Sequence, residues 1–176
     1  LITPFHFLFE SGDEVFLEIE NSADGPGSDF RIYNVAGDEN DVFIPVGDYS
    51  WTRGIIGFQT SSRRKLQFQH DYSFGDFYDG TRIENTSELT YLPSKYFGAE
   101  MSYSNQDVEL PAGDFNIKLA SLTALINFTP DFTWSNVVQY DNVSDSLGVN
   151  SRLIWEYRPG ARIFLVLNQS YLDERT

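Results

Sequence analysis

Hydrophobic and polar residues alternate along most of this chain with a period of two. The alternation is clear in residues 5–9 and again in residues 14–20, on the two sides of the turn Ser11-Gly12-Asp13. Period-two alternation that flanks a short Gly- and Asp-containing turn predicts two antiparallel strands. The chain therefore opens on a predicted β-hairpin.

The pattern becomes more regular from residue 49. Alternating segments near residues 65–72, 82–91, 97–104, 115–128, 149–157 and 162–170 are separated by short turns at 61–64, 92–95, 129–131 and 158–161. Longer acidic segments, at 38–41, 71–79 and 141–145, are expected to form loops at the opposite end. Strands of about 9–11 residues with short turns on one side and long loops on the other are typical of bacterial outer-membrane barrels. We therefore expect an all-β fold, an antiparallel up-and-down transmembrane β-barrel.

The chain is expected to be one segment of such a barrel rather than several domains. Residues 1–48 are less regular, with long loops, and residues 49–171 form the regular meander. Short strands are expected near 30–35 and 42–46, between clusters of Gly, Pro, Asp and Asn. A loop folded into or over a barrel would have this pattern.

The alternation predicts one polar and one apolar face, with two exceptions. Leu125 falls on the polar side of its strand, and residues 162–170 are apolar on both sides. Aromatic residues near the strand ends are expected to form interfacial rings, as in barrel walls: Tyr72, Tyr91, Tyr96, Tyr103, Phe115, Phe128, Phe132, Tyr140, Tyr157 and Tyr171.

The polar side of the strands is the expected lining of the lumen. Its candidate residues include neutral amides and side chains of both signs of charge: Gln67, Gln69, Arg82, Glu84, Glu88, Glu100, Arg152 and Glu156. Mixed charge can line a water-filled pore and set its selectivity, or form cross-strand ion pairs that hold a narrow barrel closed. The number of strands would separate these two readings, because small barrels fill with side chains.

The amino-acid composition limits the classes of molecule that the chain can bind. The net charge of −14, from 26 acidic and 12 basic residues, excludes nucleic acid, whose binding needs a basic face. No apolar run approaches the roughly 20 residues of a spanning helix. The mean hydropathy of −0.32 suits a wall in which only alternate positions are apolar. Expected partners are outer-membrane lipid and lipopolysaccharide, together with a small solute or a saccharide.

Three segments carry a resemblance to a known family. Residues 140–169, from Tyr140 to Gln169, resemble the C-terminal region of an uncharacterised family of bacterial outer-membrane proteins, and residues 75–82 and 108–115 are similar to that family in the same order. In that family a carbohydrate-binding-like β-sandwich precedes a large barrel. The resemblance spans roughly residues 4–168 and is strongest from Asp48 onward. It implies location in the bacterial outer membrane and a barrel architecture, without any assigned activity.

The resemblance also implies that the chain is the C-terminal part of a larger barrel. The sandwich is absent from these residues, and Asp173 to Thr176 lack the terminal aromatic residue that such barrels use for assembly. Leu1 to Pro4 carry no signal peptide, which is expected to lie upstream.

Motifs for catalysis are missing from the sequence. It has two histidines and no cysteine, and it lacks a nucleophile elbow, a phosphate loop, a dinucleotide fingerprint and a zinc-protease motif. His70, next to Asp71, is expected to be an interfacial residue rather than a general base. We therefore expect a non-catalytic protein without a cofactor. Weak calcium candidates lie in two acidic clusters, at Asp38, Glu39, Asp41, Asp76 and Asp79.

Two alternative functions remain open from sequence. A soluble all-β module that binds a ligand or carbohydrate would show the same alternation, with the apolar residues turned inward. A barrel enzyme would place its catalytic groups at the outer rim. The expected function is passage or binding of a solute through a porin-like or transporter-like wall.

Overall fold

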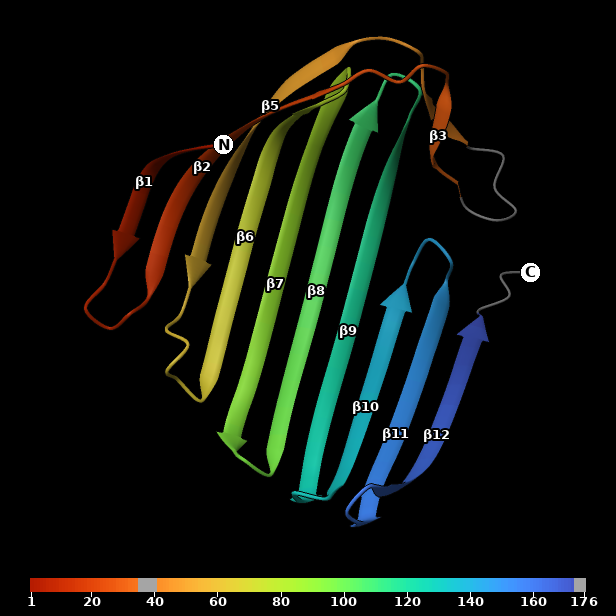
Figure 1. Cartoon of the computed structure of the whole chain (residues 1–176). Coiled ribbons are helices and arrows are strands. Elements are labelled where there is room, and N and C mark those ends of the chain that lie inside the picture. The colour runs from red at the N-terminus through yellow and green to blue at the C-terminus, as the bar shows by residue number, and fades with distance from the viewer. Residues whose placement is uncertain (35–40, 173–176) are drawn as a thin grey trace.

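The computed structural model describes residues 1–34 and 41–172, and within them the chain forms twelve strands (Figure 1). Their bounds are β1 Ile2–Leu8, β2 Glu14–Asp24, β3 Phe30–Tyr33, β4 Val42–Ile44, β5 Tyr49–Gln59, β6 Leu66–Phe77, β7 Gly80–Ser94, β8 Phe97–Leu110, β9 Gly113–Thr129, β10 Phe132–Asp141, β11 Ser146–Arg158 and β12 Ala161–Leu172. No helix in this part of the chain is long and apolar enough to cross a membrane.

Ten of the strands in the described part form one antiparallel main sheet, in the order β1-β2-β5-β6-β7-β8-β9-β10-β11-β12. β3 and β4 form a separate hairpin, inserted between β2 and β5. The predicted all-β antiparallel meander is thus confirmed, including the opening hairpin, in which Phe7 pairs with Val15. Over residues 1–34 and 41–172 the sheet stays open, with β1 and β12 at opposite edges (Figure 1).

The expected long acidic loop at 71–79 is wrong, whereas the loop expected at 141–145 is present at residues 142–145. The loop expected at 38–41 lies, except for Asp41, outside the described residues. β6 continues through Asp71 to Phe77, and only residues 78–79 turn the chain into β7. Asp71 pairs with Thr86 and Asp76 with Thr81 as ordinary strand positions, on opposite faces of the sheet. Tyr78 has a φ of 52°, which allows the tight turn. β10 and β11 are joined by residues 142–145 alone.

The main sheet has a polar face and an apolar face. Residues that pair directly across antiparallel strands project to the same side, and the register links Gln69 to Glu88 on one side and Phe68 to Leu89 on the other. We define the polar face by the row Ser102, Ser121, Gln139 and Gly148, and the apolar face by the row Met101, Leu122, Val138 and Val149. Apolar side chains are highly exposed on the second face, Leu165 by 68%. Leu125 lies on the polar face, as the sequence indicated.

The apolar face changes sides at one end of β8 and β9. Beyond Tyr103 the face that had been apolar carries Asn105, Asp107 and Glu109 on β8, opposite Lys118, Asn116 and Asp114 on β9. The other face at this height carries Val108 paired with Phe115, which are 3% and 8% exposed. The amphipathic pattern is therefore inverted at this end of the sheet.

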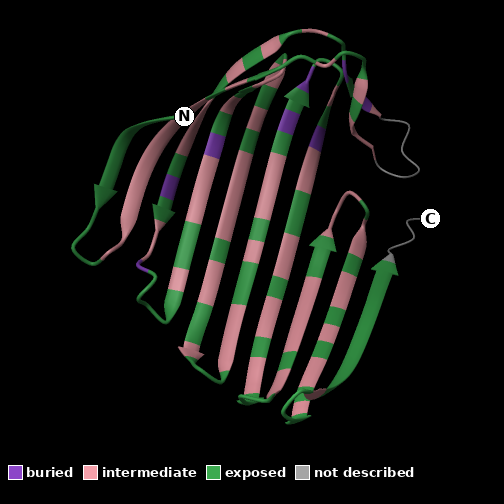
Figure 2. Cartoon of the chain, viewed as in Figure 1, coloured by how far each residue is buried: buried purple, intermediate pink, exposed green. Residues whose placement is uncertain are grey.

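The β3–β4 hairpin explains the inversion, because it covers this end of the polar face. Ile44, with no exposed surface, and Val42 pack against Val108, Leu110 and Phe115. The Tyr33 ring stacks on Phe115 at 4.4 Å between centroids. The buried residues of β8 and β9 gather at the same end (Figure 2). The predicted place of Phe115 in an interfacial aromatic ring is wrong, because its ring lies beneath this hairpin.

Candidate functional site

The eight predicted lumen residues all lie on the polar face, but in two separate groups. Six of them lie on the neighbouring strands β6, β7 and β8, where Gln69 pairs with Glu88 and Thr90 with Glu100. Arg152 and Glu156 lie on β11, across β9 and β10 from the others. Whether this face lines a lumen remains a prediction.

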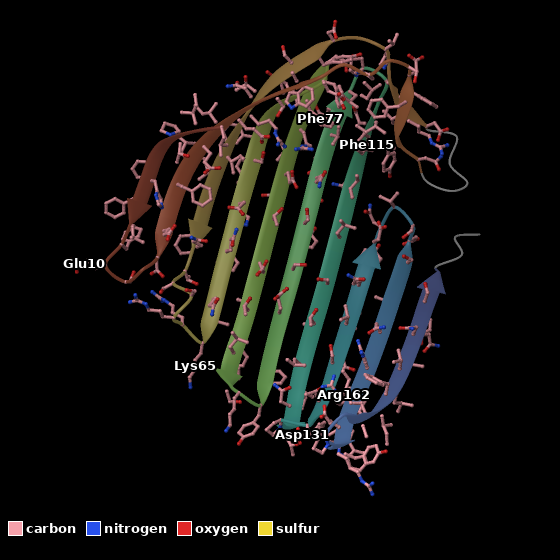
Figure 3. All side chains as sticks on the ribbon, viewed as in Figure 1. Glu10, Lys65, Phe77, Phe115, Asp131 and Arg162 are labelled. Atoms are coloured by element: carbon pink, nitrogen blue, oxygen red, sulfur yellow. The ribbon has the colours of Figure 1, made fainter. Side chains whose placement is uncertain are left out.

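Two of the eight residues close turns. The Gln67 side-chain amide donates hydrogen bonds to the carbonyl oxygens of Ser62 and Arg64, at 3.1 and 3.0 Å. One carboxylate oxygen of Glu156 accepts from the Gly160 backbone N–H at 3.1 Å, and the other from Arg162 at 2.6 Å. Lys65, Asp131 and Arg162 mark this turn end of the sheet, opposite Phe77 and Phe115 (Figure 3).

Among the six predicted lumen residues on β6, β7 and β8, Glu88 and Glu100 are the charged residues without an ion-pair partner in the described part of the chain. Both side chains are exposed, and neither has a hydrogen-bond or ion-pair partner among residues 1–34 and 41–172. Gln69, beside them, donates to Asp71 at 2.8 Å. This part of the polar face therefore presents unneutralised negative charge to its surroundings.

Arg82 and Glu84 belong to a more buried neighbourhood. The Arg82 guanidinium is 3.5 Å from the Glu84 carboxylate and lies over the Phe77 ring at 4.6 Å. Glu84 also accepts a hydrogen bond from Gln106 at 3.2 Å. Arg82 thus contacts one carboxylate and one aromatic ring, and it lies in the same row as Val108 and Phe115, which the β3–β4 hairpin covers.

A hollow of about 300 Å³ opens on the polar face beside Glu84. It spans β2, β5, β6 and β7, and it is lined by Phe16, Glu18, Arg53, Ile55, Asp71, Ser73, Glu84 and Thr86. Its middle row runs straight across the strands, since Glu18 pairs with Ile55, Ile55 with Ser73 and Ser73 with Glu84. Small pockets of this size can hold one small molecule.

Two glycines open this hollow. Gly57 lies under the Phe16 ring, where an added Cβ would be 2.0 Å from the ring carbon Cζ. Gly75 lies between Arg53 and Arg82 in their common row, so that no side chain separates the two arginines. Its φ of +144° and the 2.5 Å from an added Cβ to the Thr52 carbonyl oxygen exclude larger residues.

Several polar atoms around the hollow are buried without a partner in the described part of the chain. They are Arg53 Nε, Arg82 Nε, Asp71 Oδ1 and Ser73 Oγ. Arg53 does use its Nη2, which donates to Glu20 at 2.5 Å. Buried polar atoms without a hydrogen bond are uncommon in native proteins, and each such atom calls for an explanation.

Sequence reasoning missed most of the residues that line the hollow. It selected Glu84 but not Glu18, Arg53, Asp71, Ser73 or Thr86. Asp71 shared the polar side of its segment with Gln67 and Gln69, which was a usable signal. Thr86 likewise shared the polar side of its segment with Glu84 and Glu88. Glu18 and Arg53 join them only through the register of β2 with β5, which is set across the long connection between these strands.

An aromatic cluster marks the hairpin end of the polar face. The Tyr78 ring lies 4.8 Å from Trp51, 4.9 Å from Phe77 and 5.1 Å from Tyr49. The Tyr78 hydroxyl donates to Asp24 at 2.7 Å. Burial, and then this hydrogen bond, raise the pKa of the Tyr78 hydroxyl to about 12.

His70 and Asp71 do not form a catalytic pair, since neighbouring residues of a strand project to opposite faces. His70 Nδ1 is instead 2.9 Å from the Ser87 hydroxyl on the apolar face.

Of the calcium candidates, Asp38 and Glu39 lie outside the described residues. Asp41 accepts from Arg31 at 3.2 Å, and Asp76 lies on the side of the sheet opposite Asp71. Residues 1–34 and 41–172 contain no group of three or more His, Cys, Asp or Glu that could hold a metal ion.

Comparisons with protein families, with curated proteins and with solved structures found no match to this chain.

Proposed function

We propose that this chain is part of the wall of a bacterial outer-membrane β-barrel that passes or binds a small solute and performs no catalysis. Its apolar face contacts lipid and lipopolysaccharide, and its polar face lines the lumen. The observation that carries the proposal is the position of the large apolar side chains, most of which are exposed on one face of the main sheet, while mainly small and polar residues lie on the other. Phe164 and Val166 on β12 are exceptions that project to the polar face.

The height of the apolar band supports this reading. On β9 the band runs from Ala120 to Phe128, about nine residues, and it ends where the apolar face turns polar at Asn105 and Lys118. A tilted strand needs about 9–11 residues to cross a bilayer. β8 and β9 have 14 and 17 residues, so their remaining ends extend into water, where the β3–β4 hairpin covers them.

An aromatic belt at the turn end marks the second boundary. The rings of Phe128, Phe132, Trp155 and Tyr157 follow one another on the apolar face at centroid distances of 4.8, 6.2 and 6.1 Å. Amphipathic aromatic rings favour the level of the lipid headgroups. The belt and the polar ends of β8 and β9 enclose the band between two interfaces.

The position of the β3–β4 hairpin supports the assignment of the polar face as the inner one. A soluble barrel or sandwich would bury its large apolar residues inside and expose its polar ones. Here the β3–β4 hairpin packs on the side that carries the polar rows, which is the expected side for a loop that folds into the mouth of a barrel. The free edges of β1 and β12 are where further strands would complete the wall. The resemblance of residues 140–169 to outer-membrane proteins agrees with this assignment.

Fractionation of expressing bacteria tests the proposal. We expect the chain in the outer-membrane fraction, resistant to a urea wash, with a gel mobility that changes on heating. Purified protein in liposomes should admit small sugars, measured by osmotic swelling. Recovery of folded protein in buffer without detergent, with no heat-dependent mobility, would contradict the membrane assignment. Swelling equal to that of empty liposomes would contradict passage while leaving binding to be measured directly.

A further inference from the structure

The hollow between β2 and β7 has the features of a ligand site. Its floor is formed by Ile55 and Ser73, and Glu18 and Glu84 face each other across them in one row. The next row toward the turn end contributes the Phe16 ring, Asp71 and Thr86. The hollow therefore has an apolar side and several carboxylates around a small floor.

Ser73 provides an observation independent of the carboxylates. It is 8% exposed, and its hydroxyl oxygen has no hydrogen-bond partner in the described part of the chain. Asp71 Oδ1 is also buried and unpartnered, although Oδ2 accepts from Gln69 at 2.8 Å. Both atoms can accept hydrogen bonds from a bound ligand. A ligand with several N–H groups would satisfy both atoms.

The charge of the lining favours a cation. Glu18, Asp71 and Glu84 line the hollow together with one guanidinium, that of Arg53, which already pairs with Glu20 at 2.5 Å. Glu84 is 3.5 Å from Arg82, so Glu18 and Asp71 are the carboxylates without an ion pair in the described part of the chain. Among residues 1–34 and 41–172, Glu18 receives only a long hydrogen bond of 3.5 Å from Thr3. These carboxylates are not close enough together to form a metal-binding group among the described residues. An organic ammonium ion suits the separated carboxylates and the apolar contact with Phe16 and Ile55 better than a bare metal ion.

One unpaired hydrogen-bond donor in the hollow indicates a second group that the ligand should carry. Arg53 Nε–H is buried without an acceptor. A ligand that carries only an ammonium group would leave this donor unpaired, whereas a hydroxyl oxygen on the same ligand can accept from it. We propose that the hollow binds a small hydroxylated amine, such as an amino sugar, with the ammonium group at Asp71, Ser73 and the flanking glutamates and a hydroxyl group at Arg53. This site deepens the proposed function, since it names the class of solute that the polar face binds.

Three matched sugars test the charge requirement. Glucosamine, N-acetylglucosamine and glucose share a ring, and only glucosamine carries a positive charge at a pH at which its amine is protonated. Isothermal titration with the purified full chain should show glucosamine binding at least about tenfold more tightly than the other two, as expected for hydrogen bonds to charged groups. Equal affinity for the three sugars, or no binding of glucosamine, would overturn the inference.

Matched carboxamide variants locate the site. Glu18→Gln and Glu84→Gln should each weaken glucosamine binding about fivefold or more, because each removes a negative charge from the hollow. Glu109→Gln is the control, because Glu109 lies on the opposite face of β8, where it pairs with Thr81. An effect of Glu109→Gln equal to that of the two others would assign the binding to overall charge and contradict the site.

Ser73→Ala separates ligand binding from a structural role. Removing an unpartnered buried hydroxyl should leave the thermal midpoint of the free protein unchanged or raise it. Binding of glucosamine should nevertheless weaken, because the ammonium group loses an acceptor. Unchanged binding would remove Ser73 from the site.

The glucosamine titrations and the membrane-insertion experiments can fail independently of each other. Binding without recovery in the outer-membrane fraction would contradict the proposed function alone. Insertion and swelling without preferential glucosamine binding would contradict this inference alone.

Discussion

The Tyr78 hydroxyl donates a hydrogen bond to the Asp24 carboxylate at 2.7 Å, and so joins the turn after β6 to the last residue of β2. Asp24 is also where the long connection to the β3–β4 hairpin and β5 begins. The Tyr78 ring contacts Phe30 at the start of β3, with 6.0 Å between the ring centroids. The ring also lies 5.1 Å from that of Tyr49, the first residue of β5, so Tyr78 contacts both ends of the segment that covers the polar face.

Alkaline pH should break the hydrogen bond between Tyr78 and Asp24. The pKa of Tyr78 is raised to about 12, so its contribution to stability is complete below the usual tyrosine pKa of about 10 and is lost as pH rises through about 12. Tyr78→Phe should lower the free energy of unfolding by roughly 0.5–1 kcal/mol at neutral pH, the usual net value of one hydrogen bond. The difference between the two proteins should shrink above about pH 12. Denaturant titrations at several pH values measure both effects.

Tyr171→Phe is the matched control, because Tyr171 is exposed and has no hydrogen-bond partner in the described part of the chain. It should leave stability unchanged over the same pH range. A constant difference between wild type and Tyr78→Phe at all pH values would refute the assigned titration.

Acid should weaken the first turn of the chain. A hydrogen bond from the Ser61 backbone, followed by one from the Ser11 hydroxyl and the charge of Arg64, lowers the pKa of Asp13. A lowered carboxyl pKa stabilises the fold above the usual value of about 3.9, and this contribution is lost as pH falls through the lower folded pKa. Asp13→Asn, which resembles the protonated form, should therefore have a lower thermal midpoint than wild type at pH 7 and an equal one at sufficiently acidic pH.

Asp131→Asn tests whether any aspartate in a turn would behave in this way. Asp131 lies in the β9–β10 turn, and its carboxylate has no hydrogen-bond partner within residues 1–34 and 41–172. Its thermal midpoint should follow that of wild type from pH 7 downward. A similar loss in both variants would attribute the effect to net charge.

The β3–β4 hairpin should detach when its central contact is removed. Ile44→Ala should cost about 2–4 kcal/mol, because Ile44 has no exposed surface and packs against Val108, Leu110 and Phe115. Phe43→Ala is the matched control, since Phe43 is the next residue along and is 44% exposed. Limited proteolysis should cut residues 30–46 faster in Ile44→Ala only. Equal cleavage of both variants would contradict the packing of the hairpin on the main sheet.

Alternation in the sequence predicted the strands and their faces well, because it records which side of a strand meets an apolar environment. Gln69 and Glu88 were expected on one face, and the register pairs them directly. The predicted acidic loop at 71–79 failed because acidity was taken as a loop signal, although Asp71 shares the polar side of its strand with Gln67 and Gln69.

Other features depend on contacts between distant segments. Ile44 and Phe115 meet only because the connection from β2 to β5 folds back over the sheet, and no local pattern encodes that return. Val108 and Phe115 invert the expected faces because this hairpin covers them, so their pattern is meaningful only once the hairpin is placed. The hollow likewise needs the pairing of Glu18 with Ile55, across a connection too long to fix a register by turn geometry.

Two neighbouring residues of β9 provide the sharpest test of which face meets lipid. Leu122 lies on the apolar face, where it pairs with Met101 and Val138, and Thr123 lies on the polar face, where it pairs with Glu100 and Val137. Leu122→Arg should destabilise folding into lipid vesicles by roughly 1–3 kcal/mol, between the cost of a lipid-facing arginine at the bilayer midplane and its cost near the interface. Thr123→Arg introduces the same charge at nearly the same depth, but toward water and beside the Glu100 carboxylate, so its cost should be smaller. Equilibrium urea titrations in vesicles measure both free energies. Equal costs, or a larger cost for Thr123→Arg, would reverse or remove the assignment of the two faces.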